Sequence, residues 1–108
     1  MIDLLVKEGQ TDDGPFTVAV VRGSTFDAKA RIKEAGFRWG FPYDLYAAAP
    51  EGARSQDALE TRYGRKRKCW SLHRHGTAGE NAAWIDGLRA KLGLAPPEET
   101  EAGEDLPF

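Results

Sequence analysis

The sequence predicts a small α+β domain of about four short strands with two or three helices in residues 1–94, followed by a flexible acidic tail in residues 95–108. Short runs that are β-branched, or that alternate aromatic with polar residues, indicate strands. Between them lie amphipathic segments that begin at capping patterns and end at glycine, as helices do. With 41% hydrophobic residues the chain can form a core without disulfides. An oligonucleotide-binding barrel needs five strands and little helix, so that fold is not expected.

In the first third of the chain, residues 2–7 are expected to form a short strand and residues 8–15 a loop or hairpin turn. The β-branched run 16–21 predicts a buried strand. Ser24 with Asp27 is a capping-box-like start for a helix that ends near Ala35, before the stop residue Gly36. The residues of its buried stripe are Ala28, Ile32 and Ala35. Lys29 and Lys33 lie four residues apart on its exposed face.

The signals for secondary structure are weak in residues 42–63 and stronger in residues 69–92. Residues 37–41 alternate aromatic with Arg or Gly and predict a strand, whereas residues 42–50 are expected to be a loop, with a short strand at 45–48 as the alternative. Residues 55–63 are weakly helical, and a basic run leads into a strand at 69–74. Thr77 with Glu80 forms a capping box for a helix that ends near Leu92, before Gly93. Its apolar stripe is Trp84, Ile85, Leu88 and Leu92.

The charge distribution favours a nucleic-acid partner. The formal net charge is −2, but the last eleven residues hold five of the 17 acidic residues and none of the 15 basic ones. The body therefore carries 15 basic and 12 acidic residues, a net charge of +3. A single cysteine, Cys69, fits a reducing compartment. The chain shows no signal-peptide pattern and no long apolar run, so we expect a cytoplasmic protein that makes no membrane contact.

The tail ends Glu104-Asp105-Leu106-Pro107-Phe108, after a Pro-Pro pair and an acidic stretch without lysine. Leu106 and Phe108 could enter an apolar pocket whose basic rim suits the acidic residues. This tip resembles the C-terminal tip of bacterial single-stranded DNA-binding proteins, which ends Asp-Ile-Pro-Phe; Leu106 stands in place of the usual Ile. The resemblance implies that the tip recruits replication, repair and recombination enzymes.

A second pattern runs through residues 26–39 as Lys-x-x-x-Lys-x-x-Gly-Phe-Arg-Trp and is completed by Lys68-Cys69-Trp70. It resembles small α+β modules at the ends of exonucleases and primase-like plasmid proteins and, more loosely, the HARP domain of annealing helicases. That resemblance implies nucleic-acid binding. In the family a few residues join the two strands, whereas roughly 25 residues lie between them in this chain, which leaves the register of Trp70 against Trp39 open.

Single-strand binding without sequence preference needs a basic groove and exposed aromatic faces, and the body interleaves the two residue types. Two points stay open. One strand face would carry Phe37, Trp39 and Phe41, and it is either part of the core or a platform for base stacking. The basic run 65–68 is a phosphate-binding site, a solvated charge run or a targeting signal. The predicted DNA-binding residues are Lys29, Arg31, Lys33, Arg38, Trp39, Tyr43, Arg62, Tyr63, Arg65, Lys66, Arg67, Lys68, Trp70 and Arg74.

No pattern indicates catalysis. Cys69, His73 and His75 would share one strand face, but a structural zinc needs four ligands and a Cys-His pair needs an orienting third group. The chain also contains no glycine-rich phosphate loop and no dinucleotide fingerprint. We therefore expect no metal, no cofactor and no enzymatic activity.

Together these features predict a bacterial or phage single-stranded DNA-binding protein that coats the strand and recruits enzymes through its tail. It would act at the nucleoid, or in the host cytoplasm if phage-encoded, and could form a homo-oligomer. The alternative is a tail mimic, which binds or inhibits the partner enzymes of single-stranded DNA-binding proteins without binding DNA. A duplex or RNA binder is a third option.

Overall fold

A computed structural model describes residues 2–94 of the chain. Met1 and residues 95–108 lie outside the described residues, and with them the predictions about the tail and its docking tip. The elements are β1 (Ile2–Thr11), β2 (Gly14–Gly23), α1 (Lys29–Glu34), β3 (Arg38–Gly40), α2 (Tyr43–Ala48), η1 (Glu51–Ala53), α3 (Gln56–Tyr63), η2 (Arg65–Arg67), β4 (Cys69–His75) and α4 (Ala82–Leu92).

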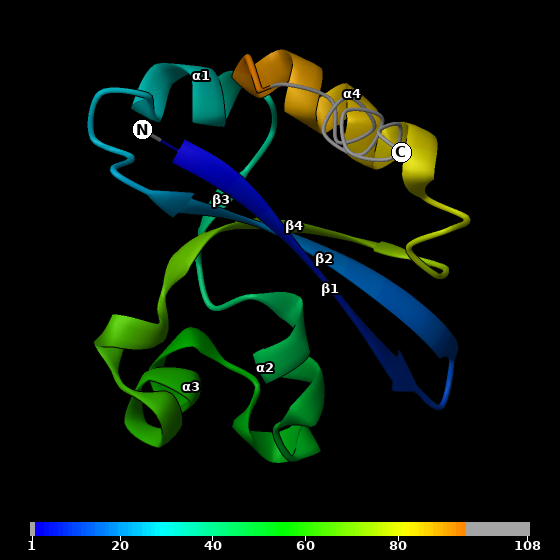
Figure 1. The fold of residues 1–108 in the computed structure, drawn as a ribbon. Helices are drawn as coiled ribbons and strands as arrows, with labels where there is room; N and C mark the ends of the chain where they lie inside the picture. Colours follow the sequence, from blue (N-terminus) through cyan, green and yellow to red (C-terminus); the bar gives the residue numbers. More distant parts are fainter. Residues whose placement is uncertain (1, 95–108) are drawn as a thin grey trace, which may run out of the picture.

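The four strands form one antiparallel sheet in the order β1-β2-β4-β3 (Figure 1). Its two edges, β1 and β3, are not paired with each other, so the sheet is open and is not a closed barrel. The predicted α+β class with four strands is thus confirmed, but the described residues contain four α-helices rather than the predicted two or three, because α2 occupies a segment expected to be a loop. None of the helices within residues 2–94 is long and apolar enough to cross a membrane.

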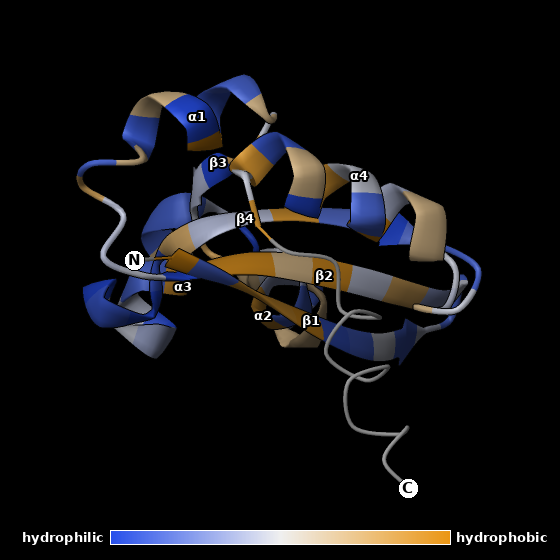
Figure 2. Ribbon diagram, turned by 45° about the horizontal axis from the view of Figure 1, so that its top comes forward, coloured by the Kyte–Doolittle hydropathy of each residue, from blue (hydrophilic) through white to orange (hydrophobic). Residues whose placement is uncertain are grey.

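Helices cover both faces of the sheet: α1 and α4 lie on one face and α2 and α3 on the other (Figure 1). The alternation of β2 explains this layering, because successive side chains of a strand point to opposite faces. Ala19 and Val21 pack into the cluster that contains the buried residues of α1 and α4. Phe16, Val18 and Val20 pack instead against α2. Figure 2 shows the resulting hydrophobic band along β2 and the start of β1.

The β1–β2 hairpin is longer than predicted. Of the expected loop or hairpin turn at 8–15, the hairpin turn is confirmed, but it has only two residues, because the strands continue to Thr11 and from Gly14. Gly9 explains part of the difference, since a Cβ at this position would stand 2.3 Å from the ring of its cross-strand partner Phe16. The absence of a side chain lets the Phe16 ring lie across the β1 backbone, an arrangement that stabilises glycine in edge strands.

Helix α1 begins later than predicted. Its N-cap is Ala28, with no side-chain cap, so Ser24 does not cap it. The N–H of Ala28 donates to the carbonyl of Thr25 at 3.2 Å, which makes residues 25–28 a separate turn ahead of the helix. The expected inward stripe is confirmed, because Ala28, Ile32 and Ala35 are all buried.

The segment after α1 departs most from expectation. Strand β3 has three residues, and Phe37 and Phe41, predicted to share one face, are buried in different clusters: Phe37 with α1 and α4, Phe41 with α2 and α3. The predicted loop or strand at 42–50 contains helix α2 instead. Leu45 and Ala49, four residues apart, are buried there against Leu59 of α3, so tertiary packing stabilises a short helix that few local signals mark.

Two helix predictions are confirmed by their caps. The Ser55 side chain accepts a hydrogen bond from the N–H of Ala58 at 3.1 Å and begins α3. Ahead of α4, the Thr77 N–H donates to Glu80 Oε1 at 2.8 Å, and the Glu80 N–H donates to Thr77 Oγ1 at 3.1 Å. This reciprocal pair is the predicted capping box. Gly93, with a left-handed backbone, ends the helix as expected.

Candidate nucleic-acid interface

Two tryptophans stand directly opposite each other at the edge of the sheet. Trp39 of β3 is in register with Trp70 of β4, with ring centroids 5.5 Å apart and planes at 59°. Trp70 has a strand on each side of it and is only 8% exposed, whereas Trp39, on the edge strand, is 58% exposed. Trp70 therefore belongs to the core, and the Trp39 ring packs against it. Of the two predicted DNA-binding tryptophans, only Trp39 presents substantial ring surface to solvent.

A basic and aromatic groove of about 500 Å³ lies between Trp39 and α1. Lys29 and Lys33 line it, as the exposed lysine pair that the sequence predicts, four residues apart on one helix face. Phe26, in the turn before α1, also lines the groove and is 81% exposed. Two exposed aromatic rings and two ammonium groups thus surround one opening, which we call the α1 groove; Thr25 and Trp70 complete its lining.

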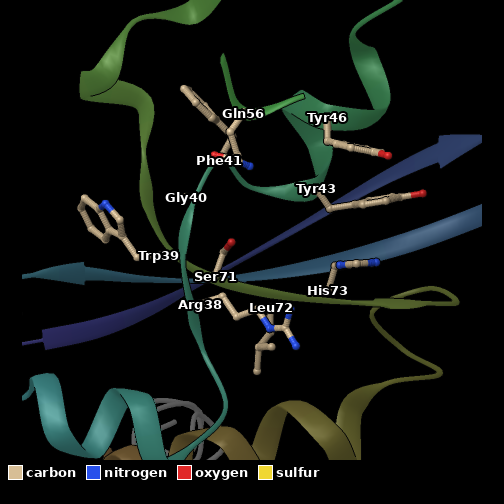
Figure 3. A pocket seen from close by; sticks show the side chains of 10 residues that line it. All are labelled: Arg38, Trp39, Gly40, Phe41, Tyr43, Tyr46, Gln56, Ser71, Leu72 and His73. Atoms are coloured by element: carbon tan, nitrogen blue, oxygen red, sulfur yellow. The ribbon is translucent and has the colours of Figure 1, made fainter. Parts of the chain in front are cut away.

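A larger groove of about 760 Å³ lies around the edge strand toward α2, and we call it the α2 groove. Trp39 lines this groove as well, so its side chain separates the two openings. Figure 3 shows Trp39 on one side of β3, with Tyr43, Tyr46 and His73 on the other. The residues that line the α2 groove are Arg38, Trp39, Gly40, Phe41, Tyr43, Tyr46, Gln56, Ser71, Leu72 and His73.

An aromatic stack forms one wall of the α2 groove. The ring of Tyr43 is stacked on His73, with centroids 3.9 Å apart, and on Tyr46, with centroids 5.9 Å apart. Arg54 lies over Tyr46, 5.5 Å from its centroid, and donates to the carbonyls of Ala47 and Ala49 at the end of α2. Burial, and to a lesser extent His75, lowers the pKa of His73 below its usual value. This wall is consequently aromatic and mostly uncharged at neutral pH.

The basic run is partly neutralised by an acidic neighbour. The carboxylate of Glu60 pairs with Arg65 at 2.7 Å and with Lys68 at 3.3 Å. Hydrogen bonds from Arg65, which is the larger cause, and from Lys68 lower the pKa of the Glu60 carboxyl. Among residues 2–94, Lys66 and Arg67 form no ion pair. These two exposed side chains are therefore the part of the run with unpaired charge.

The run connects to the α2 groove through Phe41 and Tyr63. Lys68 Nζ lies over the Phe41 ring, 5.7 Å from its centroid, and Phe41 lines the groove. Tyr63 packs against Phe41 and donates its hydroxyl to the carbonyl of Leu45 at 3.2 Å. Arg62 and Arg67 lie over the Tyr63 ring. Tyr63 thus holds α3 against α2, and its half-buried ring is covered by cations rather than presented as an open stacking face.

Two other predicted DNA-binding residues lie beside α4. Arg31 Nη1 donates to the carbonyl of Leu92 at 3.1 Å and so satisfies the C-terminal end of that helix. Arg74 lies over the ring of Trp84 in α4, 5.7 Å from its centroid. Neither residue lines the α1 or the α2 groove. The structure thus places Lys29, Lys33, Arg38, Trp39 and Tyr43 around the grooves, and separates Arg31 and Arg74 from them.

The strand face that carries Cys69, His73 and His75 points toward α2, as the alternation of β4 predicts. Within residues 2–94 no group of three His, Cys, Asp or Glu side chains could hold a metal ion. Burial raises the pKa of the Cys69 thiol, which favours its protonated form over the thiolate that would act as nucleophile or ligand.

Among the groove residues that the sequence does not single out for DNA binding are Phe26, Gln56 and His73, whereas it leaves a stacking role for Tyr46 open. Phe26 carried a usable signal, since a large apolar residue two positions after a predicted N-cap lies outside the helix stripe. Gln56 carried none, because only the packing of α2 on α3 brings it to β3. Comparison of the chain with protein-family models, with curated proteins and with solved structures finds no match.

Proposed function

We propose that this protein binds single-stranded DNA along the β3 edge of its sheet and, through its C-terminal tip, recruits replication, repair or recombination enzymes. The observation that carries the proposal is the position of Trp39, a half-exposed indole between two grooves, with lysines on one side and Arg38 on the other. Bases stack on such rings whatever their sequence, with about 1–3 kcal/mol per base, while cations track the phosphates.

The geometry favours a single strand over a duplex. Stacking on Trp39 and Phe26 needs a base with a free face, which a paired and stacked duplex does not offer inside its helix. The cations that line the grooves beside these rings are few: Lys29 and Lys33 at the α1 groove and Arg38 at the α2 groove. A small number of phosphate contacts combined with ring stacking suits an unpaired strand.

A salt titration tests the DNA-binding part. Fluorescence anisotropy with a labelled oligo-thymidine strand should show binding that weakens as salt rises, with a log–log slope of about −0.7 per neutralised phosphate. A duplex of equal length should bind more weakly. Equal or tighter binding to the duplex would contradict single-strand preference. Absence of binding to both would leave the tail-mimic function as the better account.

The recruitment part rests on the sequence of the tip, Glu104 to Phe108, and on its resemblance to single-stranded DNA-binding proteins. It is tested with a purified exonuclease or helicase that docks such tails. The full chain should bind this enzyme, and Phe108→Ala, which removes the terminal ring, should abolish that binding while DNA binding persists. The control is Leu94→Ala, a substitution before the tail. Unchanged enzyme binding by Phe108→Ala would refute this part.

A further inference from the structure

The α2 groove contains polar groups that ring stacking alone does not require. Gln56, the first residue of α3, lines the groove, and its side chain is exposed. A Cβ at Gly40 would lie 3.5 Å from Gln56 Oε1 and 3.8 Å from Nε2, so the amide is held close to the end of β3. None of the side-chain hydrogen bonds within residues 2–94 involves this amide. Its donor and its acceptor are both free to bind a ligand.

The amide lies beside Gly40, the residue that follows Trp39 on β3. Trp39 and Gly40 are neighbours on β3, where the rise is about 3.3 Å per residue. Successive side chains of a strand point to opposite faces, so a Cβ at Gly40 would point toward Gln56 and away from the Trp39 ring. Trp39 and Gln56 nevertheless both line the α2 groove (Figure 3). A base bound in this groove can therefore contact both side chains.

From this juxtaposition we propose that the α2 groove is a base-reading subsite that prefers adenine, with Gln56 as its specificity residue. The inference rests on the proposed single-stranded DNA binding and goes beyond it. A glutamine amide pairs in bidentate fashion with adenine, donating to N7 and accepting from N6.

The volume of the groove and its other polar groups fit a nucleotide. At about 760 Å³ the groove has room for a purine and its sugar. Arg38, which lines the same groove and forms no ion pair within residues 2–94, can hold the adjoining phosphate. The aromatic stack of Tyr43, Tyr46 and His73 closes the far side. The expected preference is opposite to that of a site that only stacks bases, which favours flexible pyrimidine runs.

The test compares an oligo-thymidine 12-mer with the same strand carrying adenine at every third position, a spacing that avoids stacking between adenines. The wild-type chain should bind the adenine-containing strand about fivefold or more tightly, the factor that one bidentate pair contributes. Gln56→Ala should abolish that preference and leave the oligo-thymidine affinity within about twofold. The Ser55 cap is retained in this variant, so α3 should still form.

The matched control is Gln10→Ala, which removes an exposed glutamine from β1 at the opposite edge of the sheet and should keep the preference. If the wild-type chain binds both strands equally, or if Gln56→Ala keeps the preference, the adenine subsite is refuted while single-strand binding stands. If the wild-type chain binds neither strand, the proposed function itself fails.

Discussion

The imidazole of His73 lies flat on the phenol ring of Tyr43, with ring centroids 3.9 Å apart and planes within 8° of parallel. The contact joins β4 to α2 across the sheet face that carries the larger groove. Tyr43 also meets Phe16 of β2 edge-on, at 5.0 Å. Tyr43 thus links α2 to both β2 and β4, and its contact with His73 forms part of the wall of the groove.

The first prediction concerns pH. Burial lowers the pKa of His73 in the folded state, so the unfolded chain takes up a proton at a higher pH, near its ordinary value of 6.5. The unfolded state then binds more protons, and the free energy of unfolding decreases as pH falls through and below that value, levelling off below the folded-state pKa. Urea unfolding at pH 8 and pH 5.5 should show a lower midpoint at the acidic pH.

The control variants for this prediction are His73→Gln and His75→Gln. His73→Gln should reduce the difference in midpoint between the two pH values. His75→Gln should keep most of it, because burial is the larger cause of the lowered His73 pKa and His75 the smaller. An equal pH response in wild type and His73→Gln would show that other groups cause it.

The second prediction concerns Trp39. Trp39→Ala should weaken oligo-thymidine binding by about 5- to 150-fold, which corresponds to the ~1–3 kcal/mol of one stacked base. Because this side chain is 58% exposed, its loss should change the unfolding midpoint little. Trp39→Phe keeps an aromatic face and should retain most of the affinity. A Trp39→Ala variant with wild-type affinity would place the DNA elsewhere on the molecule.

The third prediction separates the lysines of the α1 groove from other surface charge. The double variant Lys29→Ala/Lys33→Ala should make the log–log salt slope shallower by about 1.4, since each single-strand phosphate contact contributes ~0.7. Lys91→Ala removes an exposed lysine of α4 that lines neither groove, and should leave the slope unchanged. A change in slope for Lys91→Ala about half that of the double variant would mean that only net charge matters.

The fourth prediction uses the acidic neighbour of the basic run. Glu60→Gln removes the carboxylate that pairs with Arg65 and Lys68, which frees both cations for phosphate contacts. Affinity for oligo-thymidine at low salt should therefore rise, and the salt slope should become steeper. Asp57→Asn, an exposed acidic change on the same helix outside these pairs, is the control. If Glu60→Gln lowers the affinity or leaves it unchanged, the basic run does not contact the strand.

Local signals predicted much of the fold and part of the interface. The stripe of α1, the capping box at Thr77 and the lysine pair all follow from residues spaced three or four positions apart. The difference in exposure between Trp39 and Trp70 depends instead on strand order, because β4 is an inner strand and β3 is an edge strand. Likewise, Gln56 reaches β3 only because α2 packs on α3, a contact that no local pattern marks.

The last prediction tests whether the α2–α3 layer holds the α2 groove independently of the main core. Leu59 is fully buried in a small cluster with Phe41, Leu45 and Ala49. Leu59→Ala should lower the free energy of unfolding by about 2–5 kcal/mol and loosen the segment that carries Tyr46 and Gln56. Amide exchange in residues 43–63 should rise more than elsewhere, and any adenine preference should weaken.

The matched change on the other face of the sheet is Leu88→Ala. Leu88 belongs to the cluster formed by α1 and α4, so its truncation should destabilise the fold by a similar amount. It should leave amide exchange in residues 43–63 and base preference near those of the wild type, because Leu88 touches neither α2 nor α3 within its cluster. If both variants loosen the two faces equally, the sheet and both helical layers unfold as one cooperative unit, and the groove has no separate stability.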